Sequence, residues 1–288
     1  MSNSPVKIGM VGTSWWADAM HLPALDGHPA ASVQAICGRR RDPAEKMAAA
    51  WNIPEIYTDY AEMIANADID AVVISTPNDS HYPISKLALE KGLHVLCEKP
   101  IALTYPEAQE LADLAREKGV KHLVPFTYRF MPTARYLKHL ITDEDYIGKP
   151  YHLNMRYYTG YARDGKYHWR FDVGRAGSGI IGDIASHFLY LAEWFYGEIK
   201  TIYCQAGYIV PRDETDPQGN PYQVADDSAI ITMGFENGAI GTIHATAVCY
   251  EDTPFGQTHH MEFHGSDGTL YNFIDWDTIQ EVRGAKVG

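Results

Sequence analysis

The sequence is poor in cysteine, and the cysteines it has are far apart. Only four occur among 288 residues, and no two of them form a C-x-x-C pair. This excludes a disulfide framework or a zinc ribbon as the basis of the fold. The 13 histidines are more numerous, but none stands in an H-E-x-x-H or similar ligand spacing. The sequence therefore predicts no metal site.

Basic residues and long apolar runs are also scarce. Lys and Arg total 24 against 37 Asp and Glu, which gives a formal net charge of -13. A chain this acidic repels a phosphate backbone, so nucleic acid is not an expected partner. No stretch approaches the roughly 18 uninterrupted apolar residues of a membrane-spanning helix, and the first residues lack the features of a signal peptide. We therefore expect a cytoplasmic protein with no membrane partner.

What remains is an ordinary globular composition, with 45% hydrophobic and 21% charged residues. Up to residue 125, short apolar runs alternate with helical patterns, which predicts a parallel sheet covered by helices on both faces. Two of these helices are expected to start with capping boxes, at Asp42 with Glu45 and at Thr104 with Glu107.

From residue 126 onward, the pattern changes to segments in which polar and apolar residues alternate. The dipeptide Asn237-Gly238 between two such segments is a strong hairpin signal. One long helix over 180–196 interrupts the pattern. The sequence thus predicts an α/β domain over 1–125, followed by an α+β domain over 126–288 with an open, mainly antiparallel sheet.

A glycine turn follows the first predicted strand. In a dinucleotide-binding turn, the first glycine makes the bend, the second lets the main chain approach the pyrophosphate, and a small third residue allows close helix packing. Gly12 and Ala17 fit the first and third places, whereas Ser14 stands where the second glycine is usual. The motif favours a Rossmann dinucleotide-binding domain, with a plain strand-to-helix turn as the alternative.

The end of the second predicted strand bears on the choice of cofactor. An NAD enzyme usually places Asp or Glu there for the ribose hydroxyls, whereas a 2′-phosphate requires arginine. This chain reads Gly38-Arg39-Arg40-Arg41, with glycine in the place of the acid. We therefore expect NADP in preference to NAD. At least one of the three arginines is expected to be an ordinary solvated charge.

Two further segments lie just after predicted strands, where ligands of open α/β sheets bind. The first contains Thr76-Pro77-Asn78 and His81, and the second reads Glu98-Lys99-Pro100. Lys99 is expected near the nicotinamide, with a surface lysine beside Glu98 as the alternative. We expect the Lys99-Pro100 peptide to be cis. The residues predicted to bind the cofactor are Gly12, Thr13, Ser14, Trp15, Ala17, Gly38, Arg39, Arg40, Thr76, Pro77, Asn78, His81, Glu98 and Lys99.

Together these motifs resemble the glucose-fructose oxidoreductase, inositol dehydrogenase and MocA family (Gfo/Idh/MocA). The resemblance continues, in the order of the family, through residues 126–132, 169–172, 177–187 and 264–270. It implies hydride transfer between a nicotinamide cofactor and a sugar, inositol or related polyol. It also implies a dimer or tetramer assembled through the C-terminal sheet. Family members typically continue well past the 264–270 motif, so the second domain is expected to be compact or shortened.

The resemblance implies three catalytic residues, Lys99, Asp183 and His187. Asp183 and His187 are four residues apart and so share a helical face. Imidazole is suited to taking a hydroxyl proton near neutral pH, which makes His187 the expected general acid/base. Lys99 would hydrogen-bond the reacting oxygen, and Asp183 would orient the substrate or the imidazole. Without the resemblance, Asp183 and His187 would be interpreted as an ordinary helix pair.

Aromatic residues are concentrated over 151–171, which holds five of the 19 tyrosines. Their faces, next to arginines, suit the C–H faces and hydroxyls of a polyol. The family's frequent Asp three positions after its histidine is Tyr190 here, and its usual Asn near Arg129 is Thr127. The residues predicted to bind the substrate are Lys99, Arg129, Tyr161, Trp169, Arg170, Asp183 and His187.

Two other classes of function remain open on the sequence. One is a sensor that binds NAD(P) and a sugar without catalysis, which would not need a proton relay. The other is NAD-dependent glycosidase chemistry, in which transient oxidation at one carbon acidifies its neighbour. Release of an aglycone without net reduction of cofactor would identify the second.

Overall fold

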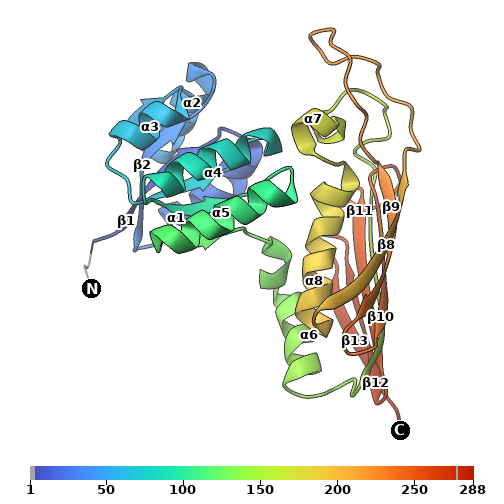
Figure 1. Cartoon of the computed structure of the whole chain (residues 1–288). Helices are drawn as coiled ribbons and strands as arrows, with labels where there is room; N and C mark the ends of the chain where they lie inside the picture. Colours follow the sequence, from blue (N-terminus) through green and yellow to red (C-terminus); the bar gives the residue numbers. More distant parts are fainter. Residues whose placement is uncertain (1–3, 277) are drawn as a thin grey trace. The chain divides into compact units, whose positions relative to one another are not determined.

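The computed structural model describes residues 4–276 and 278–288, and these form two compact units that meet in sequence between Pro125 and Phe126 (Figure 1). Within the described residues, no helix has both the length and the apolar character needed to cross a membrane.

The first unit is built on a six-stranded parallel sheet with the order β3-β2-β1-β4-β5-β6. The chain moves outward from β1 to β3 and then returns to β4 on the other side of β1. This reversal places a topological switch point between β1 and β4, which is where open α/β sheets bind ligands. The predicted Rossmann-type fold is confirmed. Its strands are β1 (Val6–Val11), β2 (Ala31–Cys37), β3 (Glu55–Tyr57), β4 (Ala71–Ile74), β5 (His94–Cys97) and β6 (His122–Leu123).

Five α-helices accompany this sheet, α1 (Leu22–Asp26), α2 (Arg41–Trp51), α3 (Tyr60–Asn66), α4 (His81–Glu90) and α5 (Tyr105–Lys118). The capping box of Thr104 and Glu107 is present at the start of α5, as predicted. The prediction for Asp42 is wrong, because α2 already begins at Arg41. The N-cap residue is Arg40, which makes no side-chain capping bond, and the carboxylate of Glu45 accepts from the guanidinium of Arg41 at 2.8 Å.

The second unit is built on a seven-stranded sheet with the order β13-β12-β11-β7-β10-β9-β8. Only β7 and β10 are parallel, so the prediction of a mainly antiparallel sheet is confirmed. The predicted hairpin joins β9 and β10, and Gly238 has a φ of 88° there. The strands are β7 (Pro150–Thr159), β8 (Ile199–Gly207), β9 (Ser228–Phe235), β10 (Ile240–Thr246), β11 (Gln257–Gly265), β12 (Gly268–Ile274) and β13 (Gln280–Lys286).

Helices α6 (Pro132–Thr142) and α8 (Ser186–Tyr196) belong to the second unit, together with the short α7 (Val173–Ala176). Helix α8 lies along one face of the sheet (Figure 1). Its buried side chains, among them Phe188 and Leu191, share a core with the inward residues of the strands, such as Leu153, Ile243 and Phe263. The opposite face of the sheet carries the alternate, more exposed residues, and no helix among residues 126–276 and 278–288 packs on it.

Candidate functional site

The switch point of the first sheet requires a glycine. Gly12 follows β1 with a φ of +121°, and a Cβ there would lie 2.2 Å from the carbonyl oxygen of Ser75. Ser14 takes a local structural role, because its Oγ lies 3.1 Å from Ser75 Oγ and accepts from the backbone N–H of Ala17 at 3.1 Å. Ala17 is fully buried. The turn is therefore tight and brings the main chain of Gly12 close to that of Ser75 after β4.

The arginines after β2 are not equivalent. Arg41 is paired with Glu45 on α2. Arg39 and Arg40 are exposed, and neither has an acidic partner among residues 4–276 and 278–288. Gly38 is buried, and a Cβ there would lie 2.7 Å from Cγ2 of Thr13. The end of β2 thus offers two unpaired positive charges and no carboxylate at position 38.

Glu98, directly before Lys99, is almost completely buried. Its Oε1 accepts from the indole N–H of Trp16 at 2.8 Å and lies 2.9 Å from Nε2 of His21. Burial alone would raise the pKa of Glu98, but the His21 hydrogen bond and charge, with the Trp16 indole, hold it below its ordinary value. Trp16 and His21 were not predicted as site residues.

His81 joins the two loops that were predicted to line the cofactor. Its ring is 1% exposed, with Nδ1 2.7 Å from the carbonyl oxygen of Pro100 and Nε2 2.8 Å from that of Thr76. The Lys99-Pro100 peptide is cis, as predicted. The polar atoms of His81 and Glu98 already make hydrogen bonds within the protein. That either side chain contacts a cofactor directly stays a prediction.

In the second unit, the helix predicted over 180–196 is not uniform. Residues Ile181–Ala185 form a π-helical turn, and the α-helix proper begins at Ser186. Asp183 lies in the π turn and His187 in the first turn of α8. Because a π turn takes more residues than an α turn, side chains four apart lie about one turn from each other. π-helical turns are rare in proteins, and those that occur are often found at functional sites.

A buried carboxylate fixes the start of this helix. Asp226 accepts from the backbone N–H groups of Gly179 and Ile181, each at 2.9 Å. A Cβ on Gly179 would lie 1.7 Å from the carbonyl oxygen of Asp226, so only glycine fits. Sequence reasoning missed Asp226. The signal was the pair of acidic residues, Asp226 and Asp227, directly before a predicted strand.

Two of the predicted substrate residues, Tyr161 and Arg170, contact the side chain of Asp183. Its Oδ2 accepts from the hydroxyl of Tyr161 at 2.9 Å and lies 3.3 Å from Nε of Arg170. Trp169 in turn stacks against the guanidinium of Arg170, 4.5 Å from the ring centroid. The pKa of Tyr161 is raised by desolvation and by the negative charge of Asp183. Since 44% of Tyr161 is exposed, the carboxylate is the more direct cause.

His187 is held among aromatic rings. It is 5% exposed and stacks on Tyr128, with centroids 4.2 Å apart and an interplanar angle of 15°. Phe126 meets it edge-on at 5.5 Å. Behind Tyr128 lies His259, whose pKa burial lowers to about 3. The contacts with Tyr128 and Phe126 therefore fix the plane of the His187 imidazole.

Arg129, also predicted to bind substrate, lies in a separate aromatic cluster. Its guanidinium donates to the hydroxyl of Tyr190 and lies 5.2 Å from the ring centroid of Trp194. Tyr190 stacks on Phe126 at 4.6 Å. The tyrosine at position 190 thus has a partner in Arg129, and both reach the surroundings of His187 through Phe126.

The predicted site residues are therefore divided between the two units. The first holds the glycine turn, the arginines and Lys99, and the second holds Asp183, His187 and the aromatic residues. Among the described residues, no group of three or more His, Cys, Asp or Glu side chains could hold a metal ion.

Two family profiles match the chain. One, described as an oxidoreductase family with an NAD-binding Rossmann fold, covers residues 6–126, and the other, the GFO/IDH/MocA C-terminal domain, covers residues 134–271. Fold and profiles together define a two-domain, nicotinamide-dependent oxidoreductase. The chain belongs to the Gfo/Idh/MocA family, which confirms the resemblance.

Named relatives include several sugar dehydrogenases. Levoglucosan dehydrogenase of Pseudarthrobacter phenanthrenivorans is 31% identical over 77% of this chain, and the match spans 60% of that relative. The NADP(+)-dependent D-xylose 1-dehydrogenase of Haloarcula marismortui is 25% identical over 96% of this chain and 75% of that relative. A solved levoglucosan dehydrogenase in complex with NADH matches with a TM-score of 0.84 and 26% identity, over 99% of this chain and 81% of the solved chain.

Proposed function

We propose that the chain is an NADP(H)-preferring oxidoreductase that interconverts an alcohol and a carbonyl on a sugar or cyclic polyol. The observation that carries this proposal is the arrangement around Asp183 and His187. A carboxylate held by Tyr161 and Arg170 lies one helical turn from a buried imidazole. Relatives named as levoglucosan and D-xylose dehydrogenases support the substrate class.

The first unit has the features that a nicotinamide dinucleotide requires. Its strand order reverses between β1 and β4, and a tight turn at Gly12, which has no room for a Cβ beside Ser75, follows β1 at this switch point. Arg39 and Arg40 would bind a 2′-phosphate, because both are exposed and lack acidic partners among the described residues. Their charge, and the absence of an acid at position 38, favour NADP over NAD.

The nicotinamide, when bound, supplies the hydride acceptor or donor. The protein must then move the hydroxyl proton and stabilise charge on the reacting oxygen. His187 would take that proton, since its ring plane is fixed by Tyr128 and Phe126. Lys99 would donate a hydrogen bond to the same oxygen. Asp183, already oriented by Tyr161 and Arg170, would hold a neighbouring hydroxyl or the imidazole.

The aromatic wall favours a sugar over an open-chain alcohol. Tyr161 and Trp169 present rings beside the guanidinium of Arg170. Ring faces match the C–H faces of a pyranose, while the guanidinium and the Asp183 carboxylate match its hydroxyls. The three side chains are therefore proposed to bind the sugar.

The test is to mix purified protein with NADP+ or NAD+ and a panel of sugars while following the absorbance of the reduced nicotinamide. Lys99→Ala and His187→Ala are each expected to lower kcat by roughly 100-fold or more, the range for loss of a general acid or base. Cofactor affinity should remain close to that of the wild type. Full activity in both variants would refute the assigned roles.

Two other results would replace the proposal with one of the alternatives. Binding of both cofactor and sugar, with no turnover under any condition of the panel, would identify a sensor. Release of an aglycone from a glycoside, without net reduction of the cofactor, would identify glycosidase chemistry.

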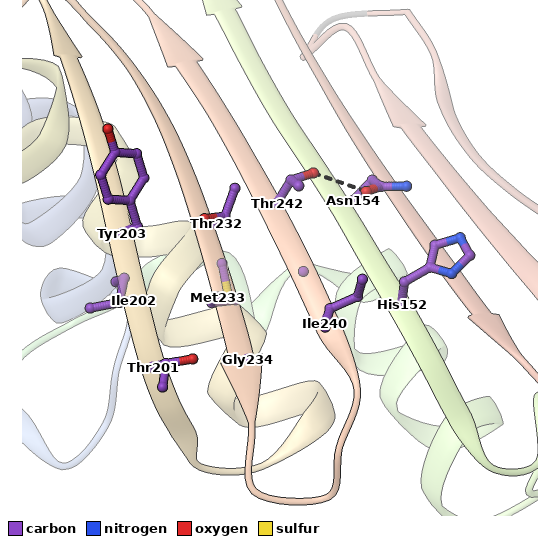
Figure 2. A pocket seen from close by; sticks show the side chains of 11 residues that line it. His152, Asn154, Thr201, Ile202, Tyr203, Thr232, Met233, Gly234, Ile240 and Thr242 are labelled. Carbon is purple, nitrogen blue, oxygen red and sulfur yellow. Dashed lines mark hydrogen bonds between the residues drawn. The ribbon is translucent and has the colours of Figure 1, made fainter.

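The open face of the second sheet is proposed to pair with a second copy of the chain, as the family resemblance implies. A groove on this face, with a volume of about 490 Å³, runs across β8, β9, β10 and β7. Figure 2 shows the side chains that line it. Exposed apolar side chains, including Tyr203 and Ile240, line it together with hydroxyl groups. The polar floor includes a hydrogen bond from Thr242 to Asn154 at 2.9 Å. A face of this kind suits a subunit interface more than free solvent.

A further inference from the structure

Two histidines hold the residues on either side of Lys99. His21 contacts the side chain of Glu98, and His81 contacts the carbonyl group of Pro100. We propose that His21 and His81 are positioning residues that together fix the start of the Lys99 side chain. This proposal rests on the role proposed above for Lys99.

The contact on the Glu98 side is built from a helix that follows the glycine turn. His21 ends the π-helical turn Ala17–His21, and Trp16 stands directly before that turn. Both donate to one carboxylate oxygen, while the second oxygen of Glu98 lies 3.3 Å from the backbone N–H of Lys99. The His21 and Glu98 side chains are each 11% exposed. A nearly buried carboxylate with these partners has one stable orientation.

The contact on the Pro100 side is built from the start of α4. His81 is the first residue of that helix, and its ring spans from the carbonyl of Thr76 to that of Pro100. The turn before it is closed by Ser80, which donates to the carbonyl of Pro77 at 2.7 Å. His81 is 1% exposed and each ring nitrogen has a carbonyl partner, so another rotamer would break both contacts. Pro100 is therefore tied to the Thr76 loop.

These contacts matter because a lysine side chain has four rotatable bonds and a mobile end. The direction of the side chain is therefore set first by the Lys99 backbone. That backbone is held on one side through Glu98, by His21, and on the other side through Pro100, by His81. One anchor, His21, ends the helical turn that follows the glycine turn, and the other, His81, is bonded to the Thr76 loop. Both neighbouring segments are proposed to hold the cofactor. Lys99 is thus set relative to the cofactor, and a displacement of about 1 Å can cost on the order of 100-fold in rate.

The experiment compares Leu and Gln variants at both positions with wild type. His21→Leu and His81→Leu remove all hydrogen bonding, whereas His21→Gln and His81→Gln keep an N–H donor. His122→Gln is the matched control, because His122 is exposed on β6 of the same unit. For each protein, kcat and the dissociation constant of the cofactor are measured.

Each Leu variant is expected to lose roughly 10- to 100-fold in kcat, the scale of a misplaced catalytic group, with the cofactor constant changed by less than about threefold. The Gln variants should recover most of the loss, and His122→Gln should match wild type. A wild-type kcat in both Leu variants would overturn the proposal. So would a parallel loss of kcat and cofactor affinity that Gln does not rescue, which would indicate general structural damage.

A second measurement does not depend on turnover. Lysines are dimethylated with ¹³C, and the Lys99 signal is identified by its absence in Lys99→Arg. The Leu variants should shift or broaden this signal, and His122→Gln should not. If the wild type oxidises no sugar, the proposed function fails while this signal still decides the positioning role. An unchanged Lys99 signal in both Leu variants would refute it.

Discussion

At the scale of single residues, the arginines after β2 have different tasks. Arg41 forms an ion pair with Glu45 within α2, whereas Arg39 and Arg40 are exposed to solvent. An exposed arginine without a carboxylate nearby adds little to folding stability. Such an arginine can bind an anion, and at the end of β2 the proposed anion is the 2′-phosphate of NADP.

Arg39→Ala and Arg40→Ala should therefore weaken NADP(H) binding without weakening NAD(H) binding. A charge-assisted hydrogen bond contributes roughly 1.5–3 kcal/mol, so each variant should raise the NADP(H) dissociation constant by about 10-fold or more. Titration of both cofactors by fluorescence measures this. Arg41→Ala is the control and should bind both as the wild type does. Equal losses for NADP(H) and NAD(H) would contradict a 2′-phosphate site.

A buried histidine gives the second unit a predictable response to pH. His259 is 2% exposed, and burial lowers its pKa from 6.5 to about 3. Below pH 6.5 the imidazole of His259 becomes protonated in the unfolded chain but stays neutral in the folded chain. Stability is therefore complete above pH 6.5 and is lost progressively as the pH falls toward 3. From pH 6.5 to 5 this amounts to about 2 kcal/mol.

His259→Leu should flatten this part of the pH profile, because leucine of similar volume cannot titrate. Urea unfolding at several pH values between 5 and 7 measures the slope. His122→Gln, which changes an exposed histidine, should keep the slope of the wild type. The interpretation is wrong if His259→Leu retains the same fall in stability with decreasing pH.

Sequence reasoning supplied candidate residues for the chemistry, but it did not find the residues that hold the site together. The resemblance to the family implied Asp183 and His187, whereas Gly12 was identified by its place after a predicted strand. His21, Trp16 and Asp226 were missed because their partners lie 77, 82 and 47 residues away. Local patterns cannot show a contact that depends on chain crossing between distant strands.

At the scale of the element, the helix that carries Asp183 and His187 depends on how it begins. A helix start leaves backbone N–H groups without intrahelical partners. Here the buried carboxylate of Asp226, two residues before β9, accepts from the N–H groups of Gly179 and Ile181. The π turn that follows keeps Asp183 and His187 aligned, so the start of the helix sets their orientation.

Asp226→Ala should destabilise the protein and lower activity together. It would leave two buried N–H groups unpaired, at a cost of roughly 2–4 kcal/mol in the free energy of unfolding. Asp226→Asn should lose less, because its amide oxygen still accepts a hydrogen bond. Urea unfolding with steady-state kinetics measures both effects. An unfolding midpoint in Asp226→Ala equal to that of the wild type would contradict the capping role.

Two edge strands carry little strand signal of their own in the sequence. β3 has only three residues, too few for a pattern, and β13 is mostly exposed and polar. Such edge strands are specified by pairing with their neighbours, not by alternation of their own side chains. By contrast, the Asn237-Gly238 hairpin was predictable because a tight turn demands particular residues.

At the scale of the whole molecule, the second sheet is unequal on its two faces. One face is packed against α8, and its inward residues, such as Leu153 and Ile243, are fully buried. The other exposes large side chains, with Tyr203 and Ile240 each 64% exposed. An exposed apolar surface on a sheet favours association. Within a homo-oligomer the simplest partner is the same face of a second copy, related by a two-fold axis.

We therefore predict a dimer or tetramer that a single charge on this face disrupts. Sedimentation at micromolar concentration should show the wild type as an oligomer and Ile240→Glu and Tyr203→Glu as monomers or much weaker oligomers. A buried, unpaired carboxylate at the centre of an interface costs several kcal/mol, enough to separate subunits at this concentration. Tyr105→Glu is the matched control, because Tyr105 is an exposed tyrosine on α5 of the first unit. A monomeric wild type would contradict the interface, and a tetramer that Tyr203→Glu reduces to a dimer would assign the face to one of two contacts.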